Sequence, residues 1–410
     1  MKSRFDLSLG PAFDRIWVAS MTTNLADGLL KVAAPLLAVT LTDSPLLISL
    51  MSALVMLPWL FFAIPIGGLV DRVDRRLALA GANATRFLIT ALVALLIATD
   101  SMTIYWLYLA TFVIGICEVL VDTTAQSLIP QVVEEKNLER ANSRLQVAET
   151  VIQEFIGAPI SGILYSVAIV IPFIANSAGF VIATILVLLV PPQLVKDLNK
   201  SSERKESTFK EDLSIGLKFM FAHQRIRRIV FITTSIGFFA SLSTSTTVLF
   251  ILKVINVPAH SFGLIMAIQG GGGVLGGLLA PRLSTRWGRG PVMAVSITTS
   301  CISMIATGFS ANVYLFLLFS FAIGFFITNW NILLMASYQT MIPNELFGRV
   351  HGARRTFVWG LMPIGSLAGG WIATINLRLP FIVGGIAASL ICMATFRFIY
   401  TLDTAQVEAT

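Results

Sequence analysis

Ionisable side chains stand inside the long apolar stretches of this sequence. Asp27, Glu118, Asp122 and Glu154 are each flanked by runs of aliphatic residues. A charged side chain in the hydrocarbon of a membrane costs about 3 kcal/mol and is usually kept there for a function. Apolar surroundings favour the protonated form of a carboxyl group, so such a group can exchange protons or bind a cation. The first 190 positions hold five more ionisable or polar residues of this kind: Asn24, Lys31, Arg86, Glu149 and Gln153.

The interior acids are not equivalent. Glu118 and Glu154 are the first candidates for a proton carrier, because each lies near the expected middle of its apolar stretch with no basic residue close in sequence. Glu149 lies nearer the expected cytoplasmic end, which favours a structural role. Asp27 has the polar neighbour Asn24, and we expect it to face a central cavity.

Permanent ion pairs are the alternative to a role in coupling. Asp27 and Lys31 are four residues apart and therefore share one face of a helix. Arg86 can pair with Glu118 or with Asp122. Because the interior acids outnumber these two bases, we expect at least two acids to remain without a basic partner.

The second half of the sequence has no interior carboxylate of this kind. Its apolar stretches contain aromatic and amide residues instead, which we expect to form the wall of the same cavity: Phe325, Asn329, Trp330 and Trp359. The glycines at 270–273 lack the Lys-Ser/Thr ending of a phosphate-binding loop, so they predict a tight helix crossing. No histidine cluster and no nucleophile with its base is visible, which argues against an enzyme and against a metal or cofactor.

The elements that carry these residues are predicted to be transmembrane helices. The chain has 410 residues, of which 56% are hydrophobic and 12% charged. Soluble domains are about 25% charged, so a soluble protein is excluded. A helix needs about 20 apolar residues to cross a membrane. The apolar runs predict an all-α protein with twelve such helices, at 13–41, 45–70, 77–98, 103–129, 143–165, 168–190, 229–252, 261–281, 291–309, 312–341, 353–374 and 379–400.

Charge in the connecting loops predicts the orientation. One set of loops contains nearly all the Lys and Arg residues, and the other set contains only Lys253 and Arg378. Cytoplasmic loops collect positive charge, so we expect both termini in the cytoplasm. This topology accounts for the net charge of +7, and no nucleic acid is expected as a partner.

The chain divides into two similar halves. We expect a six-helix bundle at 1–190, a linker at 191–228 with an amphipathic helix in the cytoplasmic interface, and a second bundle at 229–410. The sequence Gly-Gly-Leu at 67–69 returns at 276–278. Parallel repeats of this kind place a substrate site at their interface near the middle of the membrane.

A loop between the second and third helices adds a specific motif. Residues 68–76 read GLVDRVDRR. We expect this cytoplasmic gate motif to hold the outward-facing state closed on the cytoplasmic side, and simple anchoring by positive charge is the alternative. Its members are Gly68, Asp71, Arg72, Arg75 and Arg76.

The motif, the helix count and the repeat together resemble the major facilitator superfamily over the whole chain. The stretches 26–28, 34–37, 127–130, 139–142 and 157–162 resemble its branch of enterobactin exporters, macrolide efflux pumps and Tap-type multidrug pumps. Two features depart from related antiporters. The fourth helix lacks an early arginine, and the usual Gly-Pro of the fifth reads Gly157-Ala158-Pro159.

This resemblance implies a bacterial inner-membrane exporter that works as a monomer. Its substrate would be an amphipathic small molecule, such as a drug, a macrolide or a siderophore, moved by alternating access in exchange for protons. A lipid or lysolipid flippase, or an uncoupled facilitator of the same fold, is the alternative.

Overall fold

The protein is all-helical over the part of the chain that the computed structural model describes, residues 9–70, 73–133, 137, 141, 144–145, 149–190 and 209–402. Eleven helices are long and apolar enough to cross a membrane. The expected fifth span is the exception, because a π-helix occupies its first part and the apolar helix at Val151–Val167 is shorter. The predicted fold class is confirmed, whereas the orientation of the termini remains a prediction.

The helices end close to the predicted boundaries, with two extensions. One helix continues through Pro281 to Trp287, and another begins at Asn344, well before the expected residue 353. Both extensions carry polar residues, so an apolar window misses them. The bounds are α1 Pro11–Leu41, α2 Pro45–Val70, α3 Arg75–Ala98, α4 Ile104–Val132, η2 Glu149–Gly157, α6 Ala158–Val167, α7 Ile171–Leu188, α8 Phe209–Ala222, α9 Gln224–Thr244, α10 Thr247–Leu249, η5 Phe250–Val254, η6 Ala259–Ser261, α11 Phe262–Trp287, α12 Arg289–Gly308, α13 Val313–Met341, α14 Asn344–Ala373 and α15 Leu379–Tyr400.

The chain forms two compact units. The first contains residues 1–41, 61–205 and 259–263, and the second contains 42–60, 206–258 and 264–410. Two short segments are therefore grouped away from their sequence neighbours. The first part of α2 packs in the second unit, where Ser52 donates a hydrogen bond to the carbonyl of Ser245 (3.1 Å). The start of α11 packs in the first unit, where Gly263 lies against the backbone of Ala158.

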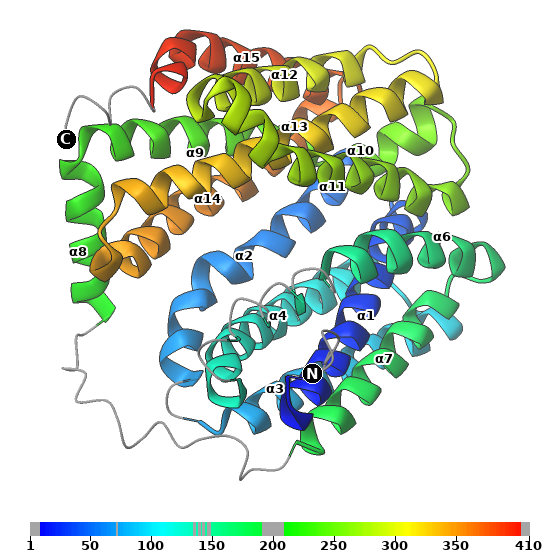
Figure 1. Ribbon diagram of the computed structural model, residues 1–410. Helices are drawn as coiled ribbons and strands as arrows, with labels where there is room; N and C mark the ends of the chain where they lie inside the picture. Colours follow the sequence, from blue (N-terminus) through cyan, green and yellow to red (C-terminus); the bar gives the residue numbers. More distant parts are fainter. Residues whose placement is uncertain are drawn as a thin grey trace, which may run out of the picture. The chain divides into compact units, whose positions relative to one another are not determined.

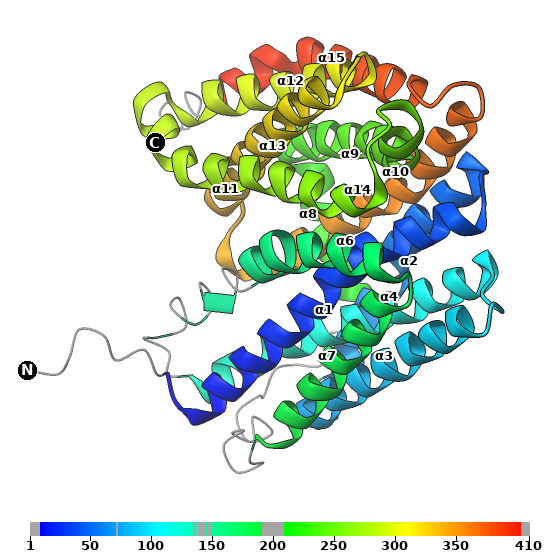
Figure 2. The ribbon, with the colours of Figure 1, turned by 90° about the vertical axis from the view of Figure 1, so that its right-hand side faces the viewer.

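In the first unit α1 packs on α7, and α3 packs on both α4 and α7 (Figures 1 and 2). The polar residues of α1 and its neighbours fix this packing. Asn176 of α7 donates to the carbonyl of Ala26 (2.5 Å), and Ser161 of α6 donates to the carbonyl of Leu29 (2.6 Å). Each bond gives a buried donor of the side chain a partner where no water is available in a membrane. Together they hold α1 in one register against α6 and α7.

A glycine contact brings α1 against the end of the π-helix. A Cβ on Gly28 would lie 2.5 Å from the carbonyl oxygen of Gln153, and one on Gly157 would lie 2.9 Å from the Cα of Gly28. The two backbones therefore touch, which only glycine at both positions permits. This crossing sets the distance between the polar residues of α1 and those of η2.

The second unit contains a large core formed by α9, α12, α13, α14 and α15. The glycines of α11 pack as predicted: Gly272 and Gly276 lie against the backbone carbonyls of Phe321 and Phe325 on α13. The predicted amphipathic helix is also present as α8. Its Gly216 lies against the carbonyl of Arg349, so one side of α8 packs on the start of α14.

Candidate functional site

Five of the predicted interior charges line one cavity in the first unit. This cavity, which we call the acidic cavity, has a volume of about 380 Å³ and lies among α1, α3, α4, η2 and α7. Four carboxylates face it with one guanidinium. The charged lining residues are Asp27, Arg86, Glu118, Asp122 and Glu149, and the polar ones include Ser20, Thr23, Asn24, Asn83 and Gln153.

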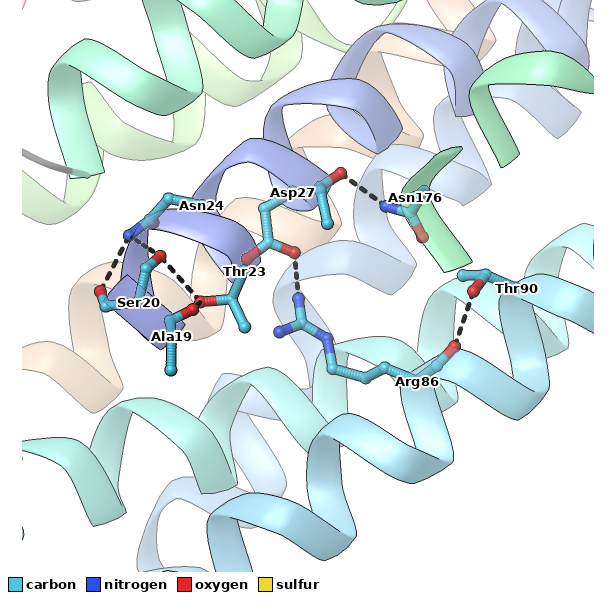
Figure 3. Close-up of polar contacts among 9 residues, drawn as sticks. Ala19, Ser20, Thr23, Asn24, Asp27, Arg86, Thr90 and Asn176 are labelled. Carbon is cyan, nitrogen blue, oxygen red and sulfur yellow. Dashed lines mark hydrogen bonds and ion pairs between the residues drawn. The ribbon is translucent and has the colours of Figure 1, made fainter. Parts of the chain in front are cut away.

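Asp27 and Arg86 form an ion pair at one side of the acidic cavity (Figure 3). The guanidinium of Arg86 also lies over the ring of Phe180, 4.2 Å from its centroid. The side chain of Arg86 is 1% exposed and that of Asp27 is 19% exposed. Arg86 is thus enclosed between α3 and α7, while Asp27 reaches the cavity.

Unpartnered polar atoms surround this pair. Nε of Arg86, Oδ1 of Asn83 and Oδ1 of Asn176 are buried and make no hydrogen bond to any described residue. A buried polar atom without a partner is unfavourable, and such atoms commonly bind water or a ligand. Arg86 and Asn83 line the cavity, so this corner can bind a polar group directly beside Asp27.

Glu118 and Asp122 of α4 add two negatively charged side chains to the acidic cavity. They are four residues apart and line the same cavity, as expected for one face of a helix. Neither forms an ion pair or hydrogen bond with a described residue, and Asp122 is exposed. The alternative in which Arg86 pairs with Glu118 or Asp122 is therefore wrong in this structure, because Arg86 pairs with Asp27 on α1.

The π-helix η2 places the polar residues of the fifth span on two sides. Pro159 has no backbone N–H to donate, so the ordinary helical ladder is interrupted just after η2. The wider i to i+5 turn is common at functional sites. Glu149 and Gln153 line the acidic cavity, whereas Glu154 pairs with Lys31 on α1.

The ion pair of Lys31 and Glu154 joins two residues that are far apart in the sequence. The alternative of a permanent pair between Asp27 and Lys31 is wrong in this structure, because the amine of Lys31 contacts Glu154. Glu154 has no basic residue close in sequence, but η2 crosses α1 at Gly28 and brings Lys31 to it. The two side chains are 45% and 24% exposed, and neither lines the acidic cavity.

Asn24 also lines the acidic cavity, as predicted. Its amide nitrogen donates to the carbonyl (2.8 Å) and to Oγ (3.1 Å) of Ser20, one turn earlier (Figure 3). These two bonds fix the orientation of the amide group. Asn24 therefore extends the polar surface that begins at Asp27.

The four residues expected to form a cavity wall in the second unit differ in their packing. Trp330 is 3% exposed in the hydrophobic core, and Asn329 is fully buried beside Gly276 with its amide bonded to the carbonyl of Phe325 (2.9 Å). Both are core residues, which corrects the expectation. Trp359 lies edge-on to Trp59 at 5.3 Å, and Arg355 stacks 4.3 Å from each ring. A role for Phe325 and Trp359 as cavity wall stays a prediction.

Part of the expected gate motif is described. Asp71 and Arg72 lie outside the described residues, as does the side-chain environment of Gly68. Arg76 donates to the carbonyl of Val190 (2.7 Å), just after α7. Asp74 was not predicted as a functional residue; its carboxylate accepts from the backbone N–H of Arg76 (2.8 Å) and Leu77 (3.2 Å) and so caps α3.

The contact of Arg76 with Val190 lies inside the first unit. Arg15 of α1 donates to the neighbouring carbonyl of Leu189 (2.5 Å). Two cations therefore meet the C-terminal end of α7, where the helix dipole favours positive charge. This contact ties α1, α3 and α7 together on one side of the unit. Arg75 also has an interaction partner.

The helical fold and its acidic cavity define a multi-pass membrane transporter. Residues 8–409 match the family described as transmembrane secretion effector. The chain therefore belongs to this family of major facilitator transporters, which are not enzymes. It is a multi-pass protein of the bacterial inner membrane.

Curated relatives are efflux proteins. Macrolide efflux protein A of Streptococcus pyogenes is 22% identical over 399 residues, covering 93% of this chain and 94% of the relative. The enterobactin exporter EntS of Citrobacter koseri is 25% identical over 352 residues, covering 84% and 81%.

Solved structures share the fold. A variant of the nucleoside transporter NupG has a TM-score of 0.77 at 13% identity, covering 95% of this chain and all of the other. A bacterial homologue of the iron transporter ferroportin has a TM-score of 0.75 at 15% identity, covering 95% and 99%.

Proposed function

We propose that this transporter exports an amphipathic cation in exchange for protons. The observation that carries the proposal is the charge of the acidic cavity, where four carboxylates face one guanidinium. That guanidinium is already paired with Asp27. A cation entering the cavity is attracted by Glu118 and Asp122, which form no ion pair with a described residue, whereas an anion such as a catecholate siderophore is repelled.

The excess of carboxylates over basic groups in the acidic cavity also favours the exchange of the substrate for protons. Several carboxylates in one cavity repel one another, and the repulsion is larger where few water molecules screen it. A bound proton or a bound cation each relieves this repulsion. The two therefore compete for the same groups, which is the property that couples their opposite movements.

We assign the exchanging groups on the basis of their partners. Glu118 and Asp122 have no basic partner among the described residues, so they are the first candidates for the proton carrier. Asp27 holds Arg86 and contributes to the binding site for the cation. Glu154 pairs with Lys31 outside the cavity, and we propose that it positions η2.

We further propose that the halves 1–190 and 229–410, which the linker 191–228 joins, move relative to one another to give alternating access. Alternating access requires contacts that form in one state and break in another. The ion pair of Asp43 and Lys253 lies within the second unit and is not such a contact. The gate motif with Asp71 and Arg72 is the candidate on the cytoplasmic side.

The experiment uses the full chain in proteoliposomes with an imposed pH gradient. The probe is a macrolide that carries a tertiary amine, and its uptake against its own gradient is measured. Glu118→Gln and Asp122→Asn are each expected to lower gradient-driven transport at least tenfold. Asp100→Asn is the matched control: Asp100 lies outside the cavity in a left-handed turn (φ 53°) that asparagine also tolerates.

Two results would contradict the proposal. One is normal gradient-driven transport by both Glu118→Gln and Asp122→Asn. The other is an equal loss in Asp100→Asn, because that would point to a general effect of removing an acid. Size-exclusion chromatography of each purified variant separates lost function from lost folding.

A further inference from the structure

A second cavity lies in the second unit, away from the acidic residues. It has a volume of about 620 Å³ and is formed by α8, α9, α14 and α15. We call it the arginine groove, because Arg227 and Arg228 are the charged residues that line it. Its size is within the roughly 300–1,000 Å³ typical of small-molecule sites.

The walls of the arginine groove are apolar and partly open. Phe221 and Phe357 meet edge to face at 5.8 Å, and Phe231 is 71% exposed. These side chains stand on or beside helices that span the membrane. An exposed phenylalanine on such a helix contacts acyl chains rather than water, so the groove is accessible to lipid.

The charge at the groove is positive and only partly neutralised. Arg227 donates one hydrogen bond, to the carbonyl of Phe221 (2.9 Å), and Arg228 lies over the ring of Phe398 at 5.6 Å. Neither forms an ion pair with a described residue, and none of the residues lining the groove is acidic. Each guanidinium therefore retains N–H donors that a phosphate can accept from.

The position of Arg227 and Arg228 on α9 strengthens the positive electrostatic potential of the groove. They stand in the first turns of the helix, where the dipole disfavours positive charge. An anion placed there is attracted both by the arginines and by the helix dipole. The arrangement is unfavourable when empty and is stabilised by a bound anion.

A buried hydroxyl provides an independent observation inside the groove. Thr234 lines the groove, and its Oγ1 is buried without a hydrogen-bond partner among the described residues. Thr234 lies about two turns along α9 from Arg227. A ligand that begins at the arginines and continues along the helix would reach it with an ester or glycerol oxygen.

We propose that the arginine groove binds an anionic phospholipid from the surrounding membrane. The phosphate contacts Arg227 and Arg228, the polar linkage approaches Thr234, and the acyl chains lie among Phe221, Phe231 and Phe398. The basic loops predict that this end of α9 faces the cytoplasm, where leaflets rich in anionic lipid attract arginine. The proposed substrate is a cation, and the arginines make the groove unsuitable for it.

The test measures lipid binding to the purified full chain in detergent by native mass spectrometry. Phosphatidylglycerol is compared with zwitterionic phosphatidylcholine of the same acyl chains. The intact protein is expected to bind phosphatidylglycerol at least fivefold more tightly. The double variant Arg227→Gln, Arg228→Gln is expected to lose this preference, whereas Arg286→Gln, Arg289→Gln, which removes two arginines outside the groove, is expected to keep it.

A second variant keeps the conclusion independent of the arginines. Ala394 is exposed in the groove, so Ala394→Trp fills the space for acyl chains and leaves both arginines in place. It is expected to weaken phosphatidylglycerol binding at least fivefold. This variant decides the test if the arginine variant does not elute as a single species.

Three outcomes would overturn the proposal. The first is an unchanged lipid preference in the arginine variant, or an equal loss in the control. The second is full displacement of lipid by inorganic phosphate with no effect of Ala394→Trp, which would identify a small-anion site. The third is displacement of the lipid by the macrolide probe, which would identify a substrate site.

Discussion

Asp27 on α1 and Arg86 on α3 form an ion pair in which Arg86 is more deeply buried than Asp27. Arg86 is enclosed by Phe180 and the first unit, whereas Asp27 reaches the acidic cavity. Removing the partner of a buried charge costs about 3–5 kcal/mol. The pair is therefore both a structural contact between two helices and one side of the proposed binding site.

Asp27→Asn is predicted to lower the midpoint of thermal unfolding, because it leaves the buried guanidinium without a countercharge. Arg86→Gln added to Asp27→Asn is expected to restore most of the lost stability, since neither charge then remains. Transport is expected to stay below a tenth of normal in the double variant. The unfolding midpoint is measured by tryptophan fluorescence in detergent. A double variant that unfolds normally and still transports at the normal rate would exclude Asp27 from the site.

The pair of Lys31 and Glu154 offers a matched comparison. Removing the charges together as Lys31→Gln, Glu154→Gln leaves no unpaired charge, so it is expected to lower stability less than removing either charge alone. Proton-driven transport is expected to remain within threefold of normal, because neither residue lines the acidic cavity. A complete loss of proton coupling in this variant, with normal folding, would return Glu154 to the position of proton carrier.

The crossing of α1 with the π-helix predicts a strong effect of one methyl group. Gly28→Ala would place its Cβ 2.5 Å from the carbonyl of Gln153, so the helices must separate. We expect a loss of about 1–3 kcal/mol, in the range of other overpacked sites. Gly81→Ala on α3 is the control, because a Cβ there meets nothing within 4 Å and alanine favours a helix by about 1 kcal/mol. Equal unfolding midpoints in the two variants would contradict the close crossing.

The gate motif predicts a shift between conformations. Asp71→Asn is expected to weaken closure on the cytoplasmic side and to increase the inward-facing population. A loss of about 1–3 kcal/mol from one state changes the ratio roughly 5- to 150-fold. Electron paramagnetic resonance distances between spin labels on the two halves measure the change. Asp74→Asn is the control, since asparagine also caps a helix. An unchanged distance distribution in Asp71→Asn would leave the motif as a simple cytoplasmic anchor.

The fold was predictable because its signal is local. A membrane helix must satisfy its own backbone groups over about 20 apolar residues, so each span is visible in the sequence by itself. Two features of the fold were not predicted, the early start of α14 and the π-helix η2. The polar first turns of α14 fall below an apolar window, and the π-helix before Pro159 depends on a missing hydrogen-bond donor.

The sequence predicted which acidic residues line the candidate site, but not which of its charged residues form ion pairs. The sequence shows that Asp27, Glu118, Asp122 and Glu149 lie inside spans, and the structure brings all four to one cavity. It does not show which base meets which acid. That choice depends on the Gly28–Gly157 crossing and on packing among α1, α3 and α7, which are contacts between residues far apart in the chain.

The same limit explains the error at Trp330. A polar or aromatic residue in a span can face a cavity or the core, and spacing along one helix does not decide between them. Trp330 faces the core because α13 packs closely on the glycines of α11 and on α12. The cap at Asp74 was not predicted because α3 begins at Arg75, two residues before the first residue of the apolar run, and Asp74 therefore directly precedes the helix.

The most direct test of proton exchange records pH inside proteoliposomes while an amine-bearing macrolide flows down its own gradient, with no pH gradient imposed. If the substrate and the proton share the acidic cavity, substrate leaving the vesicles must drive protons inward, and the interior becomes acidic. Glu118→Gln combined with Asp122→Asn is expected to abolish this acidification, and Asp100→Asn is expected to preserve it. Substrate flow through the unaltered protein at a constant internal pH would contradict the account.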